Sequence, residues 1–381
     1  MNTQTDNPYY CPLIFHGLRV EKTDRQKFKV SACCINTPGP EIDLVDFDHN
    51  EYLQQQRELV LAHKQVPGCG HCNNHSTGKS PRLGAIENFS TTSLTPDHPT
   101  LTKLDWNVDP ICNARCAHCN SYFSSAWAAE DQAHGKTLKI RRPNSTRHNT
   151  VVDQIDLSRV TAVYFDGGEP MLSADPVELL KRINDIGNIS QLWVSMTTNG
   201  SIKPSAEFVE LLSQCAAFTI NFSIDGTGSQ FEYIRNLLSW HTVESTIHWW
   251  HEQNIKVKHH FNINFTLGVH NIDIVESAHN WFKNLSQTHK NILNFNIYPC
   301  HGILSLDHSS KNLKQVWADK FSSPDVVHNT VQRMLENSSS ADNDTAWQGH
   351  FDMIDQRRNT NWTECLPELH ESLKKSQGLQ P

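Results

Sequence analysis

The sequence has no long apolar run and no recognisable targeting segment. No apolar stretch approaches the roughly 18 residues of a transmembrane helix, and the mean hydropathy of the 381-residue chain is -0.53. The first residues, MNTQTDNPYYCPLIFHG, lack the basic region and the apolar stretch that a secretory signal would have. We therefore expect a cytoplasmic protein with no membrane span.

Basic residues are also scarce. Lys and Arg number 33 against 41 Asp and Glu, the formal net charge is -8, and there is no basic tract. Proteins that bind nucleic acid generally carry a basic patch, so we do not expect a nucleic-acid partner. Hydrophobic residues make up 37% of the chain, which is long enough for one large domain or for two to three ordinary ones.

Cysteine is the residue type whose distribution stands out. Eight of the eleven cysteines lie within the first 119 residues. Disulfides are rare in the reducing cytoplasm, so binding of a metal ion or an iron–sulfur cluster explains this crowding better than disulfide stapling does. The eight are Cys11, Cys33, Cys34, Cys69, Cys72, Cys112, Cys116 and Cys119.

The middle of the chain alternates apolar, β-branched segments with segments of helical periodicity. Six strands, each followed by a helical segment, predict a parallel α/β sheet, and right-handed crossovers would wind it into a barrel or part of one. The predicted strands are 101–108, 159–167, 191–199, 217–225, 256–268 and 292–299, and the clearest helices are 175–186, 205–215 and 273–285.

The two flanks of this segment differ from it. Residues 1–95 are turn-rich and irregular, apart from a predicted helix over 46–64. After residue 300 the pattern indicates polar amphipathic helices over 323–338 and 347–375, which could cap one end of the barrel. We therefore divide the chain into an N-terminal module (1–95), a barrel (96–300) and a helical C-terminal region (301–381).

A cysteine-rich loop directly follows the first predicted strand. It reads Cys112-Asn-Ala-Arg-Cys116-Ala-His-Cys119, which has the spacing CxxxCxxC. Three thiolates can bind three irons of a [4Fe–4S] cube and leave the fourth iron open for a ligand. Zinc is the alternative, although it would lack a fourth ligand, because His118 is placed awkwardly beside Cys119.

Three short motifs stand at the ends of later strands. They are Gly167-Gly168-Glu169-Pro170, Thr197-Thr198-Asn199-Gly200 and Ser223-Ile224-Asp225-Gly226, and the last strand ends in Ile297-Tyr298-Pro299. Each is weak alone, but all lie at strand C-termini, where barrel enzymes carry their active sites. Together with the cysteine loop they resemble the radical S-adenosylmethionine (radical SAM) enzymes over roughly residues 101–300. The resemblance implies a partial (β/α)6 TIM barrel within the α/β class.

The resemblance also implies a set of cofactor-binding residues. Cys112, Cys116 and Cys119 would hold a [4Fe–4S] cluster, and S-adenosylmethionine would bind at its open iron. Glycines let the backbone approach a ligand closely, and Glu169 offers a counter-charge to the methionine ammonium. The implied S-adenosylmethionine contacts are His118, Gly167, Gly168, Glu169, Pro170, Thr198, Asn199, Ser223, Asp225, Asn264 and Tyr298.

The N-terminal cysteines resemble a second known segment. Cys11 followed by Pro-Leu-Ile-Phe, the Cys33-Cys34 pair and Cys69-Gly-His-Cys72 are similar to the SPASM or twitch segment of radical SAM enzymes. That segment usually follows the barrel, whereas here it precedes it. The resemblance implies an auxiliary [4Fe–4S] cluster bound by Cys11, one of Cys33 and Cys34, Cys69 and Cys72. A structural zinc site with the same four thiolates remains open.

The resemblance implies an enzyme that reductively cleaves S-adenosylmethionine, with an external electron donor such as flavodoxin or ferredoxin. The resulting 5'-deoxyadenosyl radical would abstract hydrogen from a peptide or an amino-acid derivative. Two alternatives stay open: a radical SAM enzyme acting on a small metabolite or nucleotide, and a non-catalytic cluster- or zinc-binding protein on a degenerate barrel. Cys300, directly after the last strand, is a candidate hydrogen donor of the kind that some radical peptide epimerases use.

Overall fold

The structure is a computed structural model. It describes residues 7–24, 27–43, 45–73, 99–107, 110–137 and 152–379. Val108, the last residue of the first predicted strand, and residues 74–95 of the N-terminal module lie outside this part of the chain.

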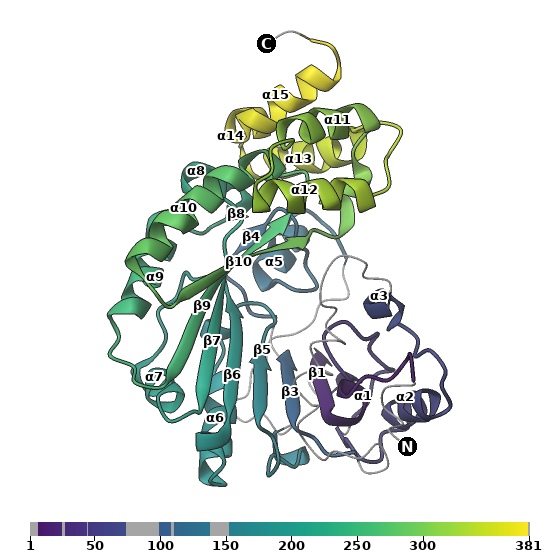
Figure 1. Cartoon of the computed structure of the whole chain (residues 1–381), viewed down its shortest axis with the longest axis vertical. Helices are drawn as coiled ribbons and strands as arrows, with labels where there is room; N and C mark the ends of the chain where they lie inside the picture. The colour runs from purple at the N-terminus through teal and green to yellow at the C-terminus, as the bar shows by residue number, and fades with distance from the viewer. Residues whose placement is uncertain are drawn as a thin grey trace.

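The six predicted strands form one parallel sheet, and they do so in chain order. They are β3 (Lys103–Asn107), β5 (Ala162–Phe165), β6 (Trp193–Thr198), β7 (Ala217–Ser223), β9 (Lys258–Leu267) and β10 (Ile292–Pro299). Each pairs in parallel with the next. This arrangement confirms the predicted α/β class and is consistent with a partial TIM barrel (Figure 1).

Two further strands extend the same sheet beyond β3. β1 (Gly17–Asp24) pairs in parallel with β3, and β2 (Lys27–Ser31) pairs antiparallel with β1. The full order is β10-β9-β7-β6-β5-β3-β1-β2. No strand was predicted in this N-terminal region, although Leu18 and Val20 alternate there with charged residues in the period of a strand. The N-terminal region also contains α1 (Leu13–His16), α2 (Glu51–Leu61) and α3 (Gly70–Asn73).

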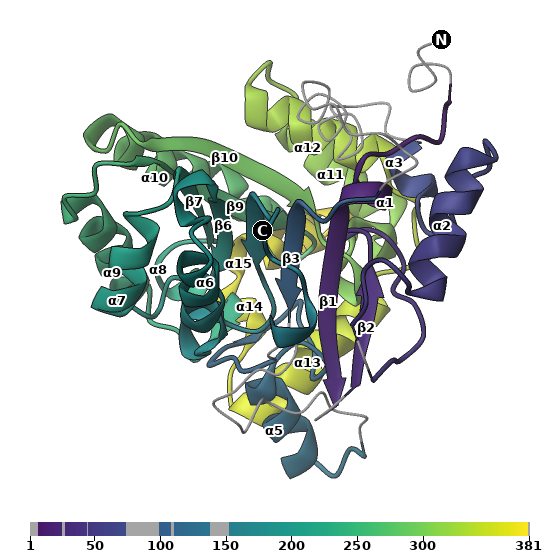
Figure 2. The ribbon, with the colours of Figure 1, turned by 90° about the horizontal axis from the view of Figure 1, so that it is seen from below.

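The helices that connect the strands lie along the outer side of the curved sheet (Figure 2). They are α6 (Asp175–Asp185), α7 (Ala206–Leu212), α8 (Gly228–Ile234), α9 (Trp240–Glu252) and α10 (Val275–Thr288). Apolar strand residues such as Val194, Met196 and Phe222 are fully buried in the core on this side. Their neighbours along the strands are polar, and Asn262 donates to Asn221 at 3.0 Å. The sheet therefore has one apolar and one polar face.

The C-terminal region forms a helical layer at one end of the sheet, beside the short strands β4 (Arg115–Cys116) and β8 (Arg235–Asn236) (Figure 1). Its buried residues Trp317, Trp347 and Phe351 share one apolar core with barrel residues such as Phe265 and Leu267. The helices are α11 (Lys311–Lys320), α12 (Val326–Asn337), α13 (Thr345–Arg358), α14 (Trp362–Cys365) and α15 (Pro367–Ser376). Within the described ranges, no helix is both long enough and apolar enough to span a membrane.

Candidate functional site

The CxxxCxxC loop is held in place by the chain that follows β7. Arg115 and Cys116 form the two-residue strand β4, which pairs antiparallel with β8. The Ala117 amide donates to the Ile234 carbonyl at 2.7 Å. The loop therefore has a defined backbone conformation at the C-terminal ends of the parallel strands.

All three cysteines of this loop line one cavity of about 740 Å³. The wall of the cavity also contains six of the residues predicted to contact S-adenosylmethionine, from four separate segments of the chain. These six are His118, Gly167, Gly168, Thr198, Asn199 and Ser223. We call this space the reactive cavity. Among the other predicted contacts, Glu169, Pro170, Asp225 and Asn264 are not part of its lining, and Tyr298 lines a neighbouring cavity.

The glycines of the Gly167-Gly168-Glu169-Pro170 motif have a structural reason to be there. Gly167 has a φ of 135°, a conformation that side-chain-bearing residues rarely adopt. A Cβ on Gly168 would lie 2.1 Å from the Ile111 carbonyl oxygen. The Glu169 amide donates to that same carbonyl at 2.6 Å. The motif thus packs tightly against the residue that precedes Cys112.

Glu169 itself connects the ends of β5 and β6. It is 1% exposed. One carboxylate oxygen accepts from the Thr198 hydroxyl at 2.6 Å and from the Met171 amide at 3.1 Å, and the other accepts from the Asn199 amide at 2.7 Å. Burial raises the pKa of Glu169, although these hydrogen bonds favour the charged form. Glu169 therefore holds the cavity-lining residues Thr198 and Asn199 in position.

An arginine that the sequence analysis missed lies beside the cysteines. Arg235 pairs with the buried Asp225 carboxylate at 2.6 Å, and its other terminal nitrogen lies 3.7 Å from the Cys116 sulfur. Burial alone would lower the pKa of Arg235, but Asp225 and Cys116 outweigh burial and raise it. Arg235 thus places a fixed positive charge at the cysteine wall of the reactive cavity. It stands in no short motif, so only the fold reveals it.

His118, one of the predicted S-adenosylmethionine contacts, stacks on another histidine. Its ring lies 5.1 Å from that of His270, and its Nε2 is 3.6 Å from Asp225. Burial and the nearby Arg235 lower the pKa of His118 to about 3. His118 is therefore neutral near pH 7.

The three cysteines are in an environment that disfavours free thiolates. Burial and their mutual repulsion raise the pKa of Cys116 to about 12 and of Cys119 to about 11, while Arg235 acts in the opposite direction. Burial also raises the pKa of Cys112. Cys116 is buried and Cys112 and Cys119 are partly buried, so three thiolates here need a compensating cationic group. Three sulfurs on the wall of an open cavity therefore fit a cluster that each sulfur binds through a different iron.

A second set of cysteines lines a smaller, mainly apolar cavity in the N-terminal region. Cys11, Cys33, Cys69 and Cys72 contribute to its wall, together with apolar residues such as Ile14 and Val66. Cys34 does not line it, and instead interacts electrostatically with the charged residues Arg19, Lys103 and Asp105. The structure therefore brings Cys33 together with Cys11, Cys69 and Cys72, whereas the sequence had left the choice between Cys33 and Cys34 open.

Within the described residues, no three His, Cys, Asp or Glu side chains are placed to hold one metal ion. The thiolates of an iron–sulfur cube bind four different irons and stand further apart than the ligands of a single ion. The reactive cavity has a volume of about 740 Å³, whereas that of the N-terminal cavity is about 30 Å³.

Charged residues from the polar face of the sheet complete the reactive cavity. Arg19 on β1 pairs with Asp166, which immediately precedes Gly167, at 2.8 Å. Both residues line the cavity, as does Tyr164, which shares a hydrogen bond with Thr197. Arg19 was also missed, because β1 was not predicted.

Cys300 lies between the reactive cavity and a second cavity of about 740 Å³. Pro299, Cys300 and His301 line both, and the second cavity continues along β10 to residues of α12. Burial raises the pKa of Cys300 to about 12, so its thiol is protonated at neutral pH.

A comparison with known families agrees with this geometry. Residues 106–280 match the family model of the Radical SAM superfamily. The matched segment is similar to a radical SAM domain and covers less than half of the chain. It contains the CxxxCxxC loop, the Gly167-Gly168-Glu169-Pro170 motif, Asp225 and Arg235.

Two curated proteins are similar to parts of the chain. One is the GTP 3',8-cyclase of Pelotomaculum thermopropionicum, which is 28% identical over 119 residues, 31% of this chain and 33% of that protein. The other is the 7,8-dihydro-6-hydroxymethylpterin dimethyltransferase of Methanocaldococcus jannaschii, 28% identical over 137 residues, 35% of this chain and 24% of that protein. The similarity thus spans a third or less of the length of each relative.

A search of solved structures matched native anSMEcpe with bound AdoMet. It has a TM-score of 0.41 and 18% identity, over 63% of each chain. Streptococcus suis SuiB bound to S-adenosylmethionine has a TM-score of 0.38 and 15% identity, over 85% of this chain and 71% of that one.

Proposed function

We propose that this protein is a radical SAM enzyme. The observation that carries the proposal is the placement of Cys112, Cys116 and Cys119 on one wall of a cavity whose other walls are polar strand ends. A [4Fe–4S] cluster bound there, supplied with electrons by a flavodoxin or ferredoxin, would cleave S-adenosylmethionine to methionine and a 5'-deoxyadenosyl radical that abstracts hydrogen from the substrate. The barrel (96–300) would carry this chemistry, between the N-terminal module (1–95) and the C-terminal region (301–381).

The residues of this chain bind and orient the cofactor. Arg235 presents its guanidinium next to Cys116, where it attracts a carboxylate such as that of S-adenosylmethionine. Asn199 also lines the cavity and is fixed by Glu169 and by Asn113 of the cysteine loop, to which it donates at 2.9 Å. These two residues give the cavity wall one fixed charge and one neutral hydrogen-bonding group.

The N-terminal cysteines support a second cluster. Cys11, Cys33, Cys69 and Cys72 supply four thiolates, which would leave no iron open for S-adenosylmethionine. Such a cluster acts in electron transfer or in structural support. The alternative is a zinc ion bound by the same four residues, which metal analysis would detect in place of the second cluster.

The substrate we favour is a peptide or an amino-acid derivative. The reactive cavity and the second cavity share Pro299, Cys300 and His301, so an extended substrate could occupy both and present one residue to the radical. Cys300, between the two cavities, is the candidate hydrogen donor. The relatives that act on GTP and on a pterin favour a nucleotide or small metabolite as the second candidate.

Spectroscopy of anaerobically reconstituted protein tests this function. We expect a brown protein whose reduced form gives an electron paramagnetic resonance signal that changes when S-adenosylmethionine is added. A colourless protein containing zinc would contradict the proposal and favour the non-catalytic binding protein.

A further inference from the structure

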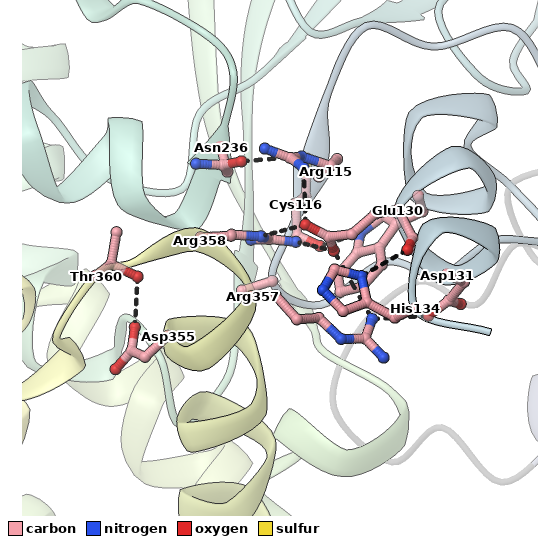
Figure 3. Close-up of polar contacts among 12 residues, drawn as sticks. Arg115, Cys116, Glu130, Asp131, His134, Asn236, Asp355, Arg357, Arg358 and Thr360 are labelled. Carbon is pink, nitrogen blue, oxygen red and sulfur yellow. Dashed lines mark hydrogen bonds and ion pairs between the residues drawn. The ribbon is translucent and has the colours of Figure 1, made fainter. Parts of the chain in front are cut away.

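The loop that carries the cysteines is tied to the far end of the chain by buried ion pairs. Glu130, on α5 (Ser125–Ala133), has a side chain that is 2% exposed and pairs with Arg115 of the loop at 2.7 Å. Arg358, the last residue of α13, donates to both oxygens of the same carboxylate at 3.0 Å each. Figure 3 shows these side chains meeting between α5 and α13. Arg357 extends the contact by pairing with Asp131 at 2.8 Å.

α13 also contacts the cysteine loop at two further points, once through Trp127 of α5 and once directly. Trp127 donates through its indole nitrogen to the Cys116 carbonyl at 2.8 Å, and the Arg358 guanidinium stacks on the Trp127 ring at 4.7 Å. His350 of α13 contacts the Ala117 carbonyl at 2.8 Å through Nε2, which must carry the proton because a carbonyl can only accept. Two consecutive carbonyls of the loop are therefore held directly or indirectly by α13.

These contacts have an excess of positive charge. Arg115, Lys136, Arg357 and Arg358 meet two carboxylates, those of Glu130 and Asp131. Removing one partner of a buried ion pair leaves the other charge uncompensated. The loss of any one of these side chains should therefore disturb the others. Positive charge near a cluster stabilises its reduced form and makes its potential less negative.

We propose that α13 positions the cysteine loop, with Arg358 acting through Glu130 and Trp127, and His350 acting on Ala117. Arg358 and His350 are positioning residues that lie outside the matched segment at 106–280. The expected effect on the reduction potential of the cluster rests on the proposed function, whereas the expected ordering of the cysteine loop does not. A bidentate contact needs the planar fork of arginine, so lysine can keep the charge but only part of the geometry.

The test compares Arg358→Gln, Arg358→Lys and Arg182→Gln with the unmodified chain. Arg182 is a matched control, because it forms an ion pair with Asp153 in which both side chains are more than half exposed. In the iron-free chain we expect amide hydrogen exchange over 112–119 to accelerate by at least about tenfold in Arg358→Gln, partly in Arg358→Lys and not in Arg182→Gln. In reconstituted protein, the midpoint potential of the cluster should become more negative in Arg358→Gln, less so in Arg358→Lys and not at all in Arg182→Gln.

His350→Phe provides a second variant in case Arg358→Gln fails to fold. It removes the donor to the Ala117 carbonyl and alters the cavity wall that His350 also lines, and in the iron-free chain it should accelerate exchange over the same segment. Unchanged loop exchange in His350→Phe and in any Arg358 variant that folds would overturn the proposal. If exchange accelerates as expected but the unmodified chain binds no cluster, the positioning role stands and the radical SAM function fails.

Discussion

Arg235 and Asp225 form a fully buried ion pair of 2.6 Å at the wall of the reactive cavity. Asp225 also accepts from the Thr266 amide at 2.8 Å, so the pair connects the end of β7 to β9 and to the cysteine loop. The pair is thus both a structural junction and the site of the cavity's fixed charge near Cys116.

Asp225→Asn should destabilise the protein strongly, because it leaves the Arg235 charge buried without its partner. Breaking a buried pair in this way costs about 3–5 kcal/mol. Urea unfolding of the iron-free chain measures the loss. Asp153→Asn is the control, since its side chain is 67% exposed and an exposed pair contributes about 0–1 kcal/mol. An equal loss of unfolding free energy in Asp225→Asn and Asp153→Asn would contradict the role of Asp225 as the partner of a buried charge.

Glu169→Gln should weaken the junction between β5 and β6. The amide nitrogen that replaces one oxygen cannot accept a hydrogen bond from a donor, and an unsatisfied buried group costs about 1–3 kcal/mol. We expect reduced stability of the iron-free chain and weaker binding of S-adenosylmethionine after reconstitution, because Thr198 and Asn199 lose their anchor. Glu210→Gln, at an exposed position on α7, should change neither. A Glu169→Gln variant with unaltered affinity would mean that this junction does not shape the cofactor site.

The N-terminal cavity predicts different roles for two adjacent cysteines. Cys33→Ala should reduce bound iron from about eight atoms per chain to about four, because it removes one of the four thiolates of the auxiliary cluster. Cys34→Ala should retain the full amount, since Cys34 does not line the cavity that the other four cysteines share. Iron and zinc analysis of both variants checks this. Retention of iron by Cys33→Ala together with its loss in Cys34→Ala would reverse the assignment.

A histidine contact near the end of α9 should make stability depend on pH. The ring of His251 lies 3.9 Å from that of His289, and burial, together with His289 and His248, lowers the pKa of His251 to about 4. The unfolded state has the ordinary histidine pKa of about 6.5, so it binds more protons than the folded state between that value and about 4. Folding stability therefore falls as the pH decreases through this window.

His251→Gln should make that fall less steep. Urea unfolding at pH 7 and pH 5 measures the difference, with the exposed His63→Gln as the control. An identical decrease in stability for His251→Gln and for the unmodified chain would contradict the account of this contact.

The strands and the cysteine loop were predictable because their signals are local. Apolar runs identified all six barrel strands, and three short motifs marked the ends of β5, β6 and β7. Arg235 was not predictable, because a single arginine has no pattern and reaches Cys116 only through the pairing of β4 with β8. The separation of Cys33 from Cys34 depends on which way two adjacent side chains face. The contact of Arg358 with Glu130 joins positions 228 residues apart.

The production of 5'-deoxyadenosine tests the central claim most directly. Protein reconstituted with iron and sulfide, reduced with dithionite and supplied with S-adenosylmethionine should form 5'-deoxyadenosine. The variant in which Cys112, Cys116 and Cys119 are all replaced by Ala should form none, while it retains the iron of the N-terminal site. Undiminished 5'-deoxyadenosine in that variant would contradict the assignment of these three cysteines as the ligands of the reactive cluster.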